Sequence, residues 1–469
     1  MTAPENPSAA PSSLRRVVLT GGAYLMGRQV LSVCLKLIGV LLITRALGPS
    51  AYGAYVAAFA LYQYAIALGS AGIGVYLLRM QGEVGEAAYG TMYVLLAGLA
   101  IILFAAIELG RRAFGHWMGV DGFESVAAII AFALPLQLLT IPANVRLERA
   151  LNYKPIALIE IVGQACYYAV ALLLVWFQAR PEALAISLIV QNAIVLVLSH
   201  VATRGWQRFA FDRSVARQML RYAVSFSAAN WIWQLRMLLN PMIVGPALGA
   251  QAVGLIGMAI GLLEMLSIVK TIAWRLSVSM LGRFQQDAAK LRRAVTEGME
   301  LQVLAVGAIL LGFGWTGGVL VPLVFGARWA PVMDVYPYLA VGYLAAAPFN
   351  MHSAALSVLN RNKALAVAFA IHVALFASVA YLAVPRYGMI GYGMGEIAAI
   401  LAYGAVHMAL AREIGSPDYR LAAVWGGAAA IGLFWQQLGL WTVAMPFAAL
   451  LAPISLRRLA SYYRQLRKD

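Results

Sequence analysis

Apolar runs of about 20 residues recur along almost the whole chain, and each is closed by charged residues or by Gly and Pro. A helix of that length spans the bilayer core, and in hydrocarbon each segment must satisfy its own backbone hydrogen bonds. The sequence lacks the alternation of apolar and polar residues expected of a membrane β-barrel. The pattern therefore predicts an all-α polytopic membrane protein without a soluble catalytic domain.

The breaks between the runs predict 14 transmembrane helices. They are expected near residues 17–43, 53–78, 88–109, 123–145, 155–178, 182–203, 221–247, 252–280, 298–324, 335–358, 364–384, 388–411, 419–435 and 437–455. Composition agrees, because 12% of the residues are charged, against roughly 25% in soluble proteins. Cys34 and Cys166 lie inside apolar runs and the histidines show no metal-binding spacing, so neither a metal site nor a cofactor is predicted.

A net charge of +16 would suggest a nucleic-acid partner in a soluble protein, but here the positions of the cations decide its meaning. The N-terminus, every second gap and the C-terminal tail together hold 24 of the 35 Lys and Arg residues. The opposite gaps hold six, namely Arg45, Arg111, Arg112, Arg180, Arg328 and Arg386. Because cytoplasmic loops carry the excess of cations, both termini are predicted to be cytoplasmic, and no nucleic acid is expected.

Three short segments of the first half recur in order in the second half. Residues 47–53 (LGPSAYG) are echoed by 248–254 (LGAQAVG), 142–144 (PAN) by 348–350 (PFN), and 151–154 (LNYK) by 359–363 (LNRNK). The offsets of 201, 206 and 208 residues predict a duplication of six spans. Because six is even, both copies should face the same way, related by a pseudo-two-fold axis along the membrane normal.

The duplication predicts how the chain is organised. A disordered cytoplasmic lead is expected at 1–16, an N-terminal six-helix bundle at 17–203, a cytoplasmic linker at 204–220 and a C-terminal six-helix bundle at 221–412. Two extra helices and a basic cytoplasmic tail should follow at 413–469. The two bundles are expected to surround a central cavity and to rock in alternating access.

Residues 44–53 (TRALGPSAYG) are similar to the R-x-L-G-x-x-x-Y-G joint between the first two helices of Wzx-type polysaccharide flippases, in the multidrug/oligosaccharidyl-lipid/polysaccharide exporter superfamily. Gly48 and Pro49 should break a helix there, and Gly53 should allow close packing in the next. Residues 321–326 with 329–331, and 387–393, resemble later joints of the family. One departure is Asn240-Pro241, where many relatives carry an Asp late in the seventh helix.

The resemblance covers nearly the full length, and it implies a function that composition does not show. It implies export of a polyprenyl-pyrophosphate-linked oligosaccharide from the cytoplasmic to the outer leaflet, for cell-surface or exopolysaccharide biosynthesis. The expected location is the cytoplasmic (inner) membrane of a bacterium, in contact with the lipid bilayer. A polysaccharide polymerase and assembly proteins are candidate partners. Ion coupling through the family's seventh-helix carboxylate is in doubt for this chain.

Five cations remain inside the predicted spans, all on the first, seventh and eighth: Arg28, Lys36, Arg236, Lys270 and Arg275. A charge in hydrocarbon is costly, so such residues usually face a cavity, and Arg and Lys bind phosphate. The sequence therefore predicts a pyrophosphate site with Arg28, Arg236 and Lys270 at its core. Lys36 would bind the headgroup nearer the outer surface and Arg275 nearer the cytoplasm. Alternatively, their side chains would extend to the membrane–water interface.

Sugar binding and ion coupling need other groups. Polar and aromatic side chains on the same helices are expected to contact the sugars, namely Tyr24, Gln29, Trp233, Gln234 and Asn240. The acids expected to be buried are fewer, namely Glu160, Glu264 and Glu396. Each is a candidate to carry a coupling proton or Na⁺, or to pair with a cation. Pairing is favoured for Glu264, which shares its predicted helix with Lys270.

Three other functions stay open from the sequence. A lipid II flippase would also need a cationic cavity, whereas a drug or cation exporter of the same superfamily would need more intramembrane acids than cations. A membrane-embedded glycan-modifying enzyme would bring a long outer loop with paired carboxylates. Only Asp121 and Glu124 lie close together in the short outer gaps, so the chain is not expected to be an enzyme.

Overall fold

The computed structural model describes residues 10–204 and 210–466, and every element in these two ranges is a helix. Nine helical stretches in the described chain are long and apolar enough to cross a membrane, and one bent pair of helices could add a tenth. The predicted class, an all-α multi-pass membrane protein, is confirmed. The nine stretches are not a count of crossings, because two of them, 49 and 40 residues long, exceed the roughly 20 residues that one crossing needs. The count of 14 stays a prediction.

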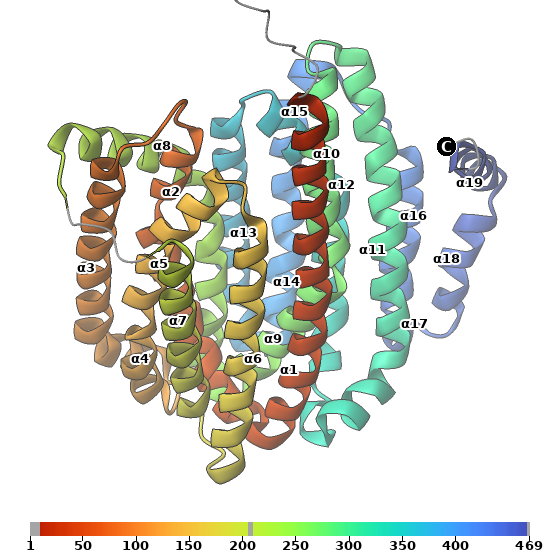
Figure 1. Ribbon diagram of the computed structural model, residues 1–469. Coiled ribbons are helices and arrows are strands. Elements are labelled where there is room, and N and C mark those ends of the chain that lie inside the picture. Colours follow the sequence, from red (N-terminus) through yellow and green to blue (C-terminus); the bar gives the residue numbers. More distant parts are fainter. Residues whose placement is uncertain (1–9, 205–209, 467–469) are drawn as a thin grey trace, which may run out of the picture. The chain divides into compact units, whose positions relative to one another are not determined.

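The chain forms two compact units, which divide between Leu238 and Leu239. The first unit contains α1 (Ala10–Ser70), α2 (Ile73–Arg79), α3 (Glu86–Met118), α4 (Phe123–Ala131), α5 (Ala133–Arg149), α6 (Tyr153–Phe177), α7 (Glu182–Ala202) and all but the last residue of α8 (Arg213–Leu239). In this unit α6 packs against α1 and α7, and α5 packs against α3 and α7 (Figure 1).

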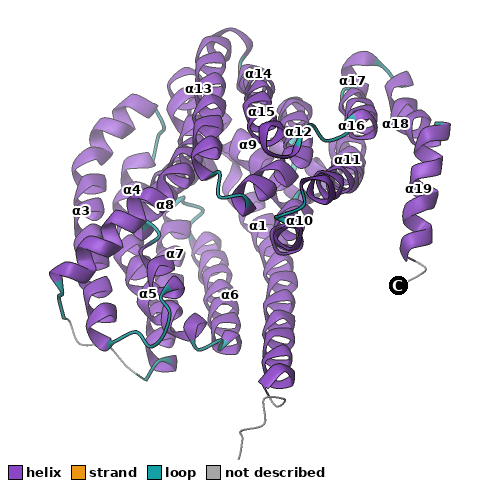
Figure 2. Cartoon of the chain, turned by 90° about the horizontal axis from the view of Figure 1, so that it is seen from above, coloured by secondary structure: helices purple, strands orange, loops and turns teal. Residues whose placement is uncertain are grey.

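The second unit begins with the π-helical turn η1 (Asn240–Val244), which leads into α9 (Gly245–Leu266), α10 (Ile268–Leu281) and the 3-10 turn η2 (Gly282–Phe284). It continues with α11 (Ala288–Phe325), η3 (Ala327–Trp329), α12 (Val332–Val358), α13 (Asn362–Tyr387), α14 (Met389–Ala399), η4 (Ile400–Ala402) and α15 (Tyr403–Ile414). The last helices are α16 (Arg420–Leu433), α17 (Trp435–Leu438), α18 (Trp441–Leu451) and α19 (Pro453–Leu466). Within the unit α12 contacts α11 and α14, and α16 lies between α11 and α18 (Figure 2).

Two glycines interrupt helices at corresponding positions of the two halves, the first of them where the motif predicted a break. Gly48 interrupts α1 with φ 76° and ψ 169°, and Gly249 interrupts α9 with φ 77° and ψ −176°. This backbone region is essentially restricted to glycine, because a side chain would clash with the backbone. The expectation that Gly48 ends a helix is therefore confirmed, and its echo in the second half adopts the same conformation.

The third pair of echoed segments also shares one geometry. Helix α5 ends with the amide of Asn152 bonded to the carbonyl of Leu147, and the amide of Leu151 bonded to that of Glu148. Helix α12 ends with the same two bonds, from Arg361 to Leu356 and from Asn360 to Ser357. Both ends are Schellman turns with a left-handed residue. The matching turns support the predicted duplication.

The ends of the predicted domains differ from the helices that form. Helix α1 begins at Ala10, inside the segment 1–16 that was expected to be disordered, while residues 1–9 lie outside the described chain. Helix α8 begins at Arg213, inside the expected linker 204–220, of which residues 205–209 are not described. By contacts, α8 belongs to the first unit, whereas the sequence repeat places it at the start of the second half. The boundary between the units reflects which helices pack together, whereas the boundary between the repeats reflects the duplication of the sequence. The two boundaries need not coincide.

Candidate functional site

The predicted anion-binding cations lie in both units. In the first unit α1 carries Lys36, whose side chain is exposed. The side chains of Tyr24, Arg28 and Gln29 on the same helix, and of Arg275 on α10, lie outside the described residues. The roles assigned to these residues stay predictions.

Helix α8 carries a half-buried polar group formed by Trp233, Gln234 and Arg236. The guanidinium carbon of Arg236 lies 5.5 Å from the ring centroid of Trp233, one turn earlier on the helix. A cation–π contact of this kind holds an arginine over an aromatic face and is stronger where water is excluded. Trp233 and Arg236 were both flagged from the sequence, and the structure brings these two together.

Three side-chain hydrogen bonds fix α8 against α1 and α2 within the first unit. The indole N–H of Trp231 donates to the carbonyl of Ala67 at 2.8 Å. The Tyr76 hydroxyl donates to Gln218 at 2.9 Å, and Arg79 donates to the Tyr222 hydroxyl at 3.1 Å. The part of α8 that precedes Arg236 is therefore attached to α1 and α2.

Tyr62, on the part of α1 that follows the glycine break, is buried in a polar contact with α7. Its side chain is 3% exposed, and its hydroxyl accepts a hydrogen bond from Asn192 of α7 at 2.8 Å. Asn192 also donates to the carbonyl of Ala133 at 3.1 Å. A buried hydroxyl and a buried amide that satisfy each other in this way are the usual solution for polar groups inside a helical bundle.

In the second unit Lys270 lies over an aromatic ring. Its ammonium nitrogen is 4.4 Å from the ring centroid of Tyr343 on α12. Its backbone carbonyl accepts a hydrogen bond from Asn350 at 2.9 Å, and the same Asn350 amide donates to Gln302 of α11 at 3.0 Å. Helices α10, α11 and α12 thus meet at Lys270, which gives this cation a fixed position.

The three candidate acids have different surroundings. Glu160 on α6 is half-buried, and Glu264 on α9 is exposed. Glu396 on α14 is 3% exposed and packs against Gly342, where an added Cβ would lie 2.2 Å from the Glu396 Cγ. Gly342 precedes Tyr343, so the buried acid and Lys270 approach neighbouring positions of α12. Glu264 and Lys270 lie on different helices, because the chain breaks at Ser267 between α9 and α10.

Asn240 opens the π-helical turn η1 and is 2% exposed. Its amide donates to the carbonyl of Val253 on α9 at 3.0 Å. Pro241, which has no backbone N–H, follows at once and accounts for the interrupted hydrogen-bond ladder. A neutral amide avoids the cost of a buried carboxylate here. Asn240 thus braces the joint, and its assignment to sugar binding stays a prediction.

A group of residues that sequence reasoning missed lies at one end of the second unit. The Tyr419 hydroxyl is 2.5 Å from Nε2 of His352 on α12 and 2.7 Å from Nδ1 of His407 on α15. Nδ1 of His352 lies 3.2 Å from the carbonyl of Pro348. The histidines appeared scattered in the sequence because His352 and Tyr419 are 67 residues apart. No short spacing signals such a contact.

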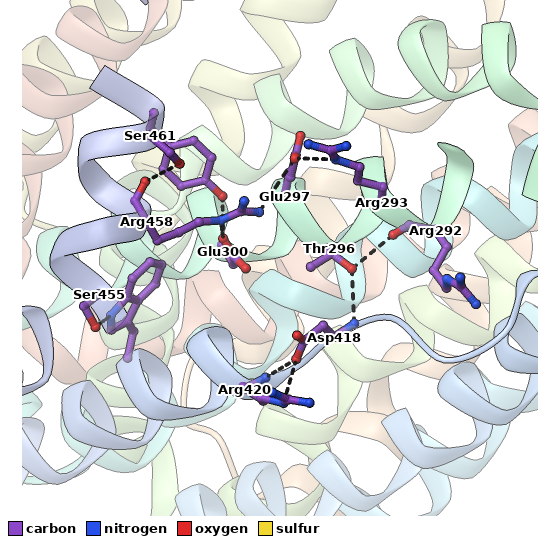
Figure 3. Close-up of polar contacts among 12 residues, drawn as sticks. Arg292, Arg293, Thr296, Glu297, Glu300, Asp418, Arg420, Ser455, Arg458 and Ser461 are labelled. Atoms are coloured by element: carbon purple, nitrogen blue, oxygen red, sulfur yellow. Dashed lines mark hydrogen bonds and ion pairs between the residues drawn. The ribbon is translucent and has the colours of Figure 1, made fainter. Parts of the chain in front are cut away.

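A second missed group joins α19 to α11. Glu300 is 4% exposed, and its carboxylate accepts a hydrogen bond from Arg458 at 2.7 Å and another from the Tyr462 hydroxyl. Arg458 also lies 3.7 Å from Glu297. Figure 3 shows Arg458 reaching from α19 toward both acids. Glu300 stands in the first turn of the predicted span 298–324, where an acid is easily taken for part of a loop.

No group of three or more His, Cys, Asp or Glu residues that could hold a metal ion occurs among the residues with described side chains. The two cysteines are both free thiols. The candidate chemistry therefore consists of cations next to aromatic rings, buried carboxylates, and the His–Tyr–His contact.

The sequence and the fold of this chain are both similar to those of known proteins. Residues 42–334 match the family model described as "Polysaccharide biosynthesis protein". The matched segment covers more than half of the chain and includes both glycine joints.

Two curated proteins share detectable sequence similarity. The amylovoran biosynthesis protein AmsL of Erwinia amylovora is 24% identical over 186 residues, which is 39% of this chain and 48% of that protein. The succinoglycan biosynthesis transport protein ExoT of Rhizobium meliloti (strain 1021) is 21% identical over 312 residues, 66% of this chain and 62% of that protein. The chain therefore spans about half and about three fifths of the lengths of these two relatives.

Solved structures share the fold at low identity. The lipid II flippase MurJ in an inward closed conformation superposes with a TM-score of 0.69 and 11% identity, over 96% of this chain and 99% of that one. A multidrug resistance MATE family transporter of the MOP superfamily, in an inward-facing conformation, gives 0.62 and 17% over 81% and 95%. At these identities the likeness shows the fold.

Proposed function

This chain belongs to the polysaccharide biosynthesis protein family, and we propose that it is a flippase that moves a polyprenyl-pyrophosphate-linked oligosaccharide from the cytoplasmic to the outer leaflet. The observation that carries the proposal is the family match over residues 42–334. The product would supply cell-surface or exopolysaccharide biosynthesis. The resemblance drawn from the sequence motifs is confirmed at the level of the family; the cargo and the direction are parts of the proposal.

The names of the relatives support a glycan cargo, since one serves amylovoran biosynthesis and the other is a succinoglycan biosynthesis transport protein. The fold supports movement across a membrane, because it is shared with a lipid II flippase and with multidrug transporters. Alternating access between the two leaflets is the mechanism we propose. We place the chain in a bacterial cytoplasmic membrane with both termini inside, alongside a polysaccharide polymerase and assembly proteins.

Phosphate recognition is assigned to the cations inside the spans. In the first unit these are Arg28, Lys36 and Arg236, and in the second Lys270 and Arg275. Contact with an aromatic ring holds Arg236 over Trp233 and Lys270 over Tyr343, which gives each cation a defined position. Arginine offers a pyrophosphate two parallel hydrogen bonds, and lysine offers a point charge.

The sugar part of the cargo needs hydrogen bonds and flat apolar faces. Trp233 and Gln234 lie on α8 beside Arg236, and both are half-buried. We assign them, with Tyr24, Gln29 and Asn240, to sugar contacts. Outward movement of an anionic headgroup is also favoured by a membrane potential negative inside, by about 2.3 kcal/mol per charge per 100 mV. Net export therefore does not require Glu160, Glu264 or Glu396 to carry an ion.

A lipid II flippase is the second candidate, because the MurJ structure superposes on 96% of the chain. Lipid II is also a polyprenyl pyrophosphate, so the cations do not distinguish the two cargoes. The names of the sequence relatives favour the polysaccharide precursor. A drug exporter is less well supported, since the helices that carry Arg28, Lys36, Arg236, Lys270 and Arg275 hold more cations than acids.

The test is transport of a fluorescent polyprenyl-pyrophosphate oligosaccharide in proteoliposomes, with lipid II as the competing cargo. Arg28→Ala or Arg236→Ala should reduce the initial rate by roughly one to two orders of magnitude, because each loses a charge-assisted hydrogen bond of about 1.5–3 kcal/mol. Arg→Lys should restore only part of the rate, since the bidentate geometry is lost.

The matched control is Arg112→Ala, which removes an exposed arginine near the end of α3 and should leave the rate unchanged. Wild-type rates in both Arg28→Ala and Arg236→Ala would show that the pyrophosphate is held elsewhere. Transport of lipid II with no transport of the oligosaccharide would replace the proposed cargo by the second candidate.

A further inference from the structure

His352, Tyr419 and His407 form a continuous hydrogen-bonded chain that the proposed transport function does not use. The three residues come from α12, the connection 415–419 and α15. The Tyr419 oxygen is the central atom, 2.5 Å from one imidazole nitrogen and 2.7 Å from the other. A hydroxyl between two imidazoles can donate to only one of them.

The contact with Pro348 fixes the direction of this chain. A carbonyl oxygen only accepts, so Nδ1 of His352, 3.2 Å from the Pro348 carbonyl, must carry the hydrogen. In the neutral ring Nε2 is then an acceptor, and Tyr419 must donate its proton to that nitrogen. The Tyr419 oxygen is left to accept from Nδ1–H of His407. Every hydrogen position in the neutral group follows from this single carbonyl contact.

Of the three side chains, only His352 is fully buried. His407 is half-buried, Tyr419 is half-buried, and His352 is 0% exposed. The far end is enclosed by aromatic rings, because Phe349 lies 5.0 Å from the His352 ring and stacks on Tyr403 at 4.7 Å. The hydrogen-bonded chain therefore runs from two half-buried side chains to one that is fully enclosed.

The connection that carries Tyr419 is held in place by α11. The backbone N–H of Asp418 donates to the Thr296 hydroxyl at 3.1 Å, and that hydroxyl donates to the carbonyl of Arg292 at 3.1 Å. The Asp418 carboxylate accepts from the N–H of Arg420 at 3.0 Å, which starts α16. Figure 3 shows these contacts on either side of position 419. Tyr419 is therefore positioned by its two neighbours in sequence.

The other charged and titratable groups around His352 come from every element packed on α12. Those nearest the relay are Tyr403 on α15, His372 on α13 with its ring 5.6 Å from Tyr403, Arg292 of α11 against Gly415, and Asp418 and Arg420 at the start of α16. The Lys270 ammonium and the Glu396 side chain lie against Tyr343 and Gly342, more than two helical turns along α12 from His352, although the Lys270 carbonyl bonds Asn350. Glu300 of α11 is buried and paired with Arg458, and Glu264 of α9 is exposed. His407 and Tyr419 are the groups that hydrogen-bond in series with His352.

We propose that His407, Tyr419 and His352 are a proton relay that ends in a buried proton-binding site on His352, and that this proton is coupled to transport by the second unit. The coupling part of the inference rests on the proposed function, whereas proton binding does not. The relay opens at the membrane face that the loop charges predict to be cytoplasmic.

The transfer balances with water as the only proton source. A proton from water binds Nε2 of His407 and makes its ring an imidazolium. The Nδ1–H bond of His407 then breaks as an O–H bond forms on Tyr419, and the original Tyr419 O–H bond breaks as an N–H bond forms on Nε2 of His352. His407 ends neutral with its hydrogen on Nε2, Tyr419 is neutral before and after, and His352 becomes the imidazolium.

A charge on His352 changes the packing of the unit. The ring is fully buried, and burial disfavours the charged form. Protonation also converts Nε2 from acceptor to donor, so Tyr419 must accept from it and turn its own proton toward His407. The charged ring therefore favours a different position of α12 against α15 and the connection 415–419, which links proton binding to movement.

The direct test is nitrogen-15 NMR of histidine-labelled, full-length protein in nanodiscs across a pH titration, with signals assigned by loss in His352→Gln and His407→Gln. We expect neutral His352 with its hydrogen on Nδ1, and titrations of His352 and His407 that depend on each other. Tyr419→Phe keeps the ring but removes the hydroxyl, and should uncouple them with a shift of about one pH unit or more. The opposite tautomer of His352, or no effect of Tyr419→Phe, would overturn the relay.

Further variants distinguish an effect on the relay from a general effect on helix packing. Thr296→Val removes the acceptor that holds Asp418 and should reproduce part of the Tyr419→Phe effect, while Thr296→Ser should restore the wild-type titration. The matched control is His200→Gln on α7, a buried histidine whose Nδ1 lies 2.8 Å from the Leu196 carbonyl, in the other unit. It should leave the titration of His352 unchanged. An equal effect of His200→Gln would contradict a local relay.

Coupling of the proton to transport is tested by measuring oligosaccharide transport with and without a pH gradient. In the wild type, a gradient of one pH unit should raise the transport rate up to about tenfold, because one unit is a tenfold ratio of proton activity. Tyr419→Phe should lose this stimulation but keep the transport that does not depend on the gradient. Transport that the gradient does not stimulate in wild type would overturn coupling alone. Absence of oligosaccharide transport in wild type would overturn the proposed function, and the NMR titration would still decide the relay.

Discussion

At the scale of single residues, backbone conformation explains why glycine stands at the two joints. Gly249 has a φ of 77°, and an added Cβ there would have no heavy atom within 4 Å. Space is therefore not what requires glycine at this position. The requirement comes from the residue's own backbone, because this φ/ψ region is unfavourable for any side chain.

We predict that Gly249→Ala lowers the free energy of unfolding by about 1–3 kcal/mol, through backbone strain alone. The matched control is Gly261→Ala on the same helix, which also has no heavy atom within 4 Å of the added Cβ but a helical backbone. It should be neutral or stabilise by roughly 0.5–1 kcal/mol. Thermal unfolding of the purified variants in detergent provides the comparison, and equal melting temperatures would contradict the strain argument.

At the scale of elements, α19 is attached to the second unit by a buried acid. Glu300 of α11 bonds Arg458 and Tyr462, which lie one turn apart on α19. Between α18 and α19 the chain bends by 58°. The side chains of Ile454, Leu456 and Tyr463 on α19 are exposed. The Glu300 contact, together with the hydrogen bond that the Trp425 indole of α16 donates to Ser455 at 2.9 Å, holds α19 against the unit.

Glu300→Gln should release α19. Arg458 would lose its close partner, and because Glu300 is buried while Arg458 is 27% exposed, the cost should fall between those of exposed and buried pairs, about 1–3 kcal/mol. Hydrogen exchange should rise across 453–466. Glu413→Gln serves as control, since its pair with Arg361 is more exposed and should contribute less than about 1 kcal/mol. Unchanged protection of α19 in Glu300→Gln would refute the anchor.

At the scale of the whole molecule, the distribution of loop cations predicts how the chain crosses the bilayer. We expect Ala113→Cys to be labelled from outside and Ser416→Cys from inside, in a background lacking Cys34 and Cys166. Both positions are exposed, so labelling reports the side of the membrane and not burial. A membrane-impermeant maleimide on intact cells makes the measurement, with permeabilised cells as the positive control. The reverse pattern would rule out the topology and place the proton relay at the outer face.

Much of the architecture could be predicted from the sequence because its causes are local. A long apolar run has to become a helix in hydrocarbon, and the Gly-Pro pair after Leu47 marks a break. The orientation that the loop cations indicate stays a prediction. The cations inside spans could likewise be found by elimination, and Trp233 with Arg236 stand one turn apart. The aromatic partner of Lys270 could not be found in this way, since Tyr343 is 73 positions later on another helix.

The sequence by itself therefore determined the all-α membrane class, the joint at Gly48 and the list of costly charges. Tertiary structure alone decided which distant side chains meet: His352 with Tyr419, Glu300 with Arg458, and Trp231 with Ala67, separated by 67, 158 and 164 residues. The physical reason is that hydropathy and turn propensity depend on neighbours along the chain. A hydrogen bond between helices depends on how their side chains interdigitate, and no local pattern records that.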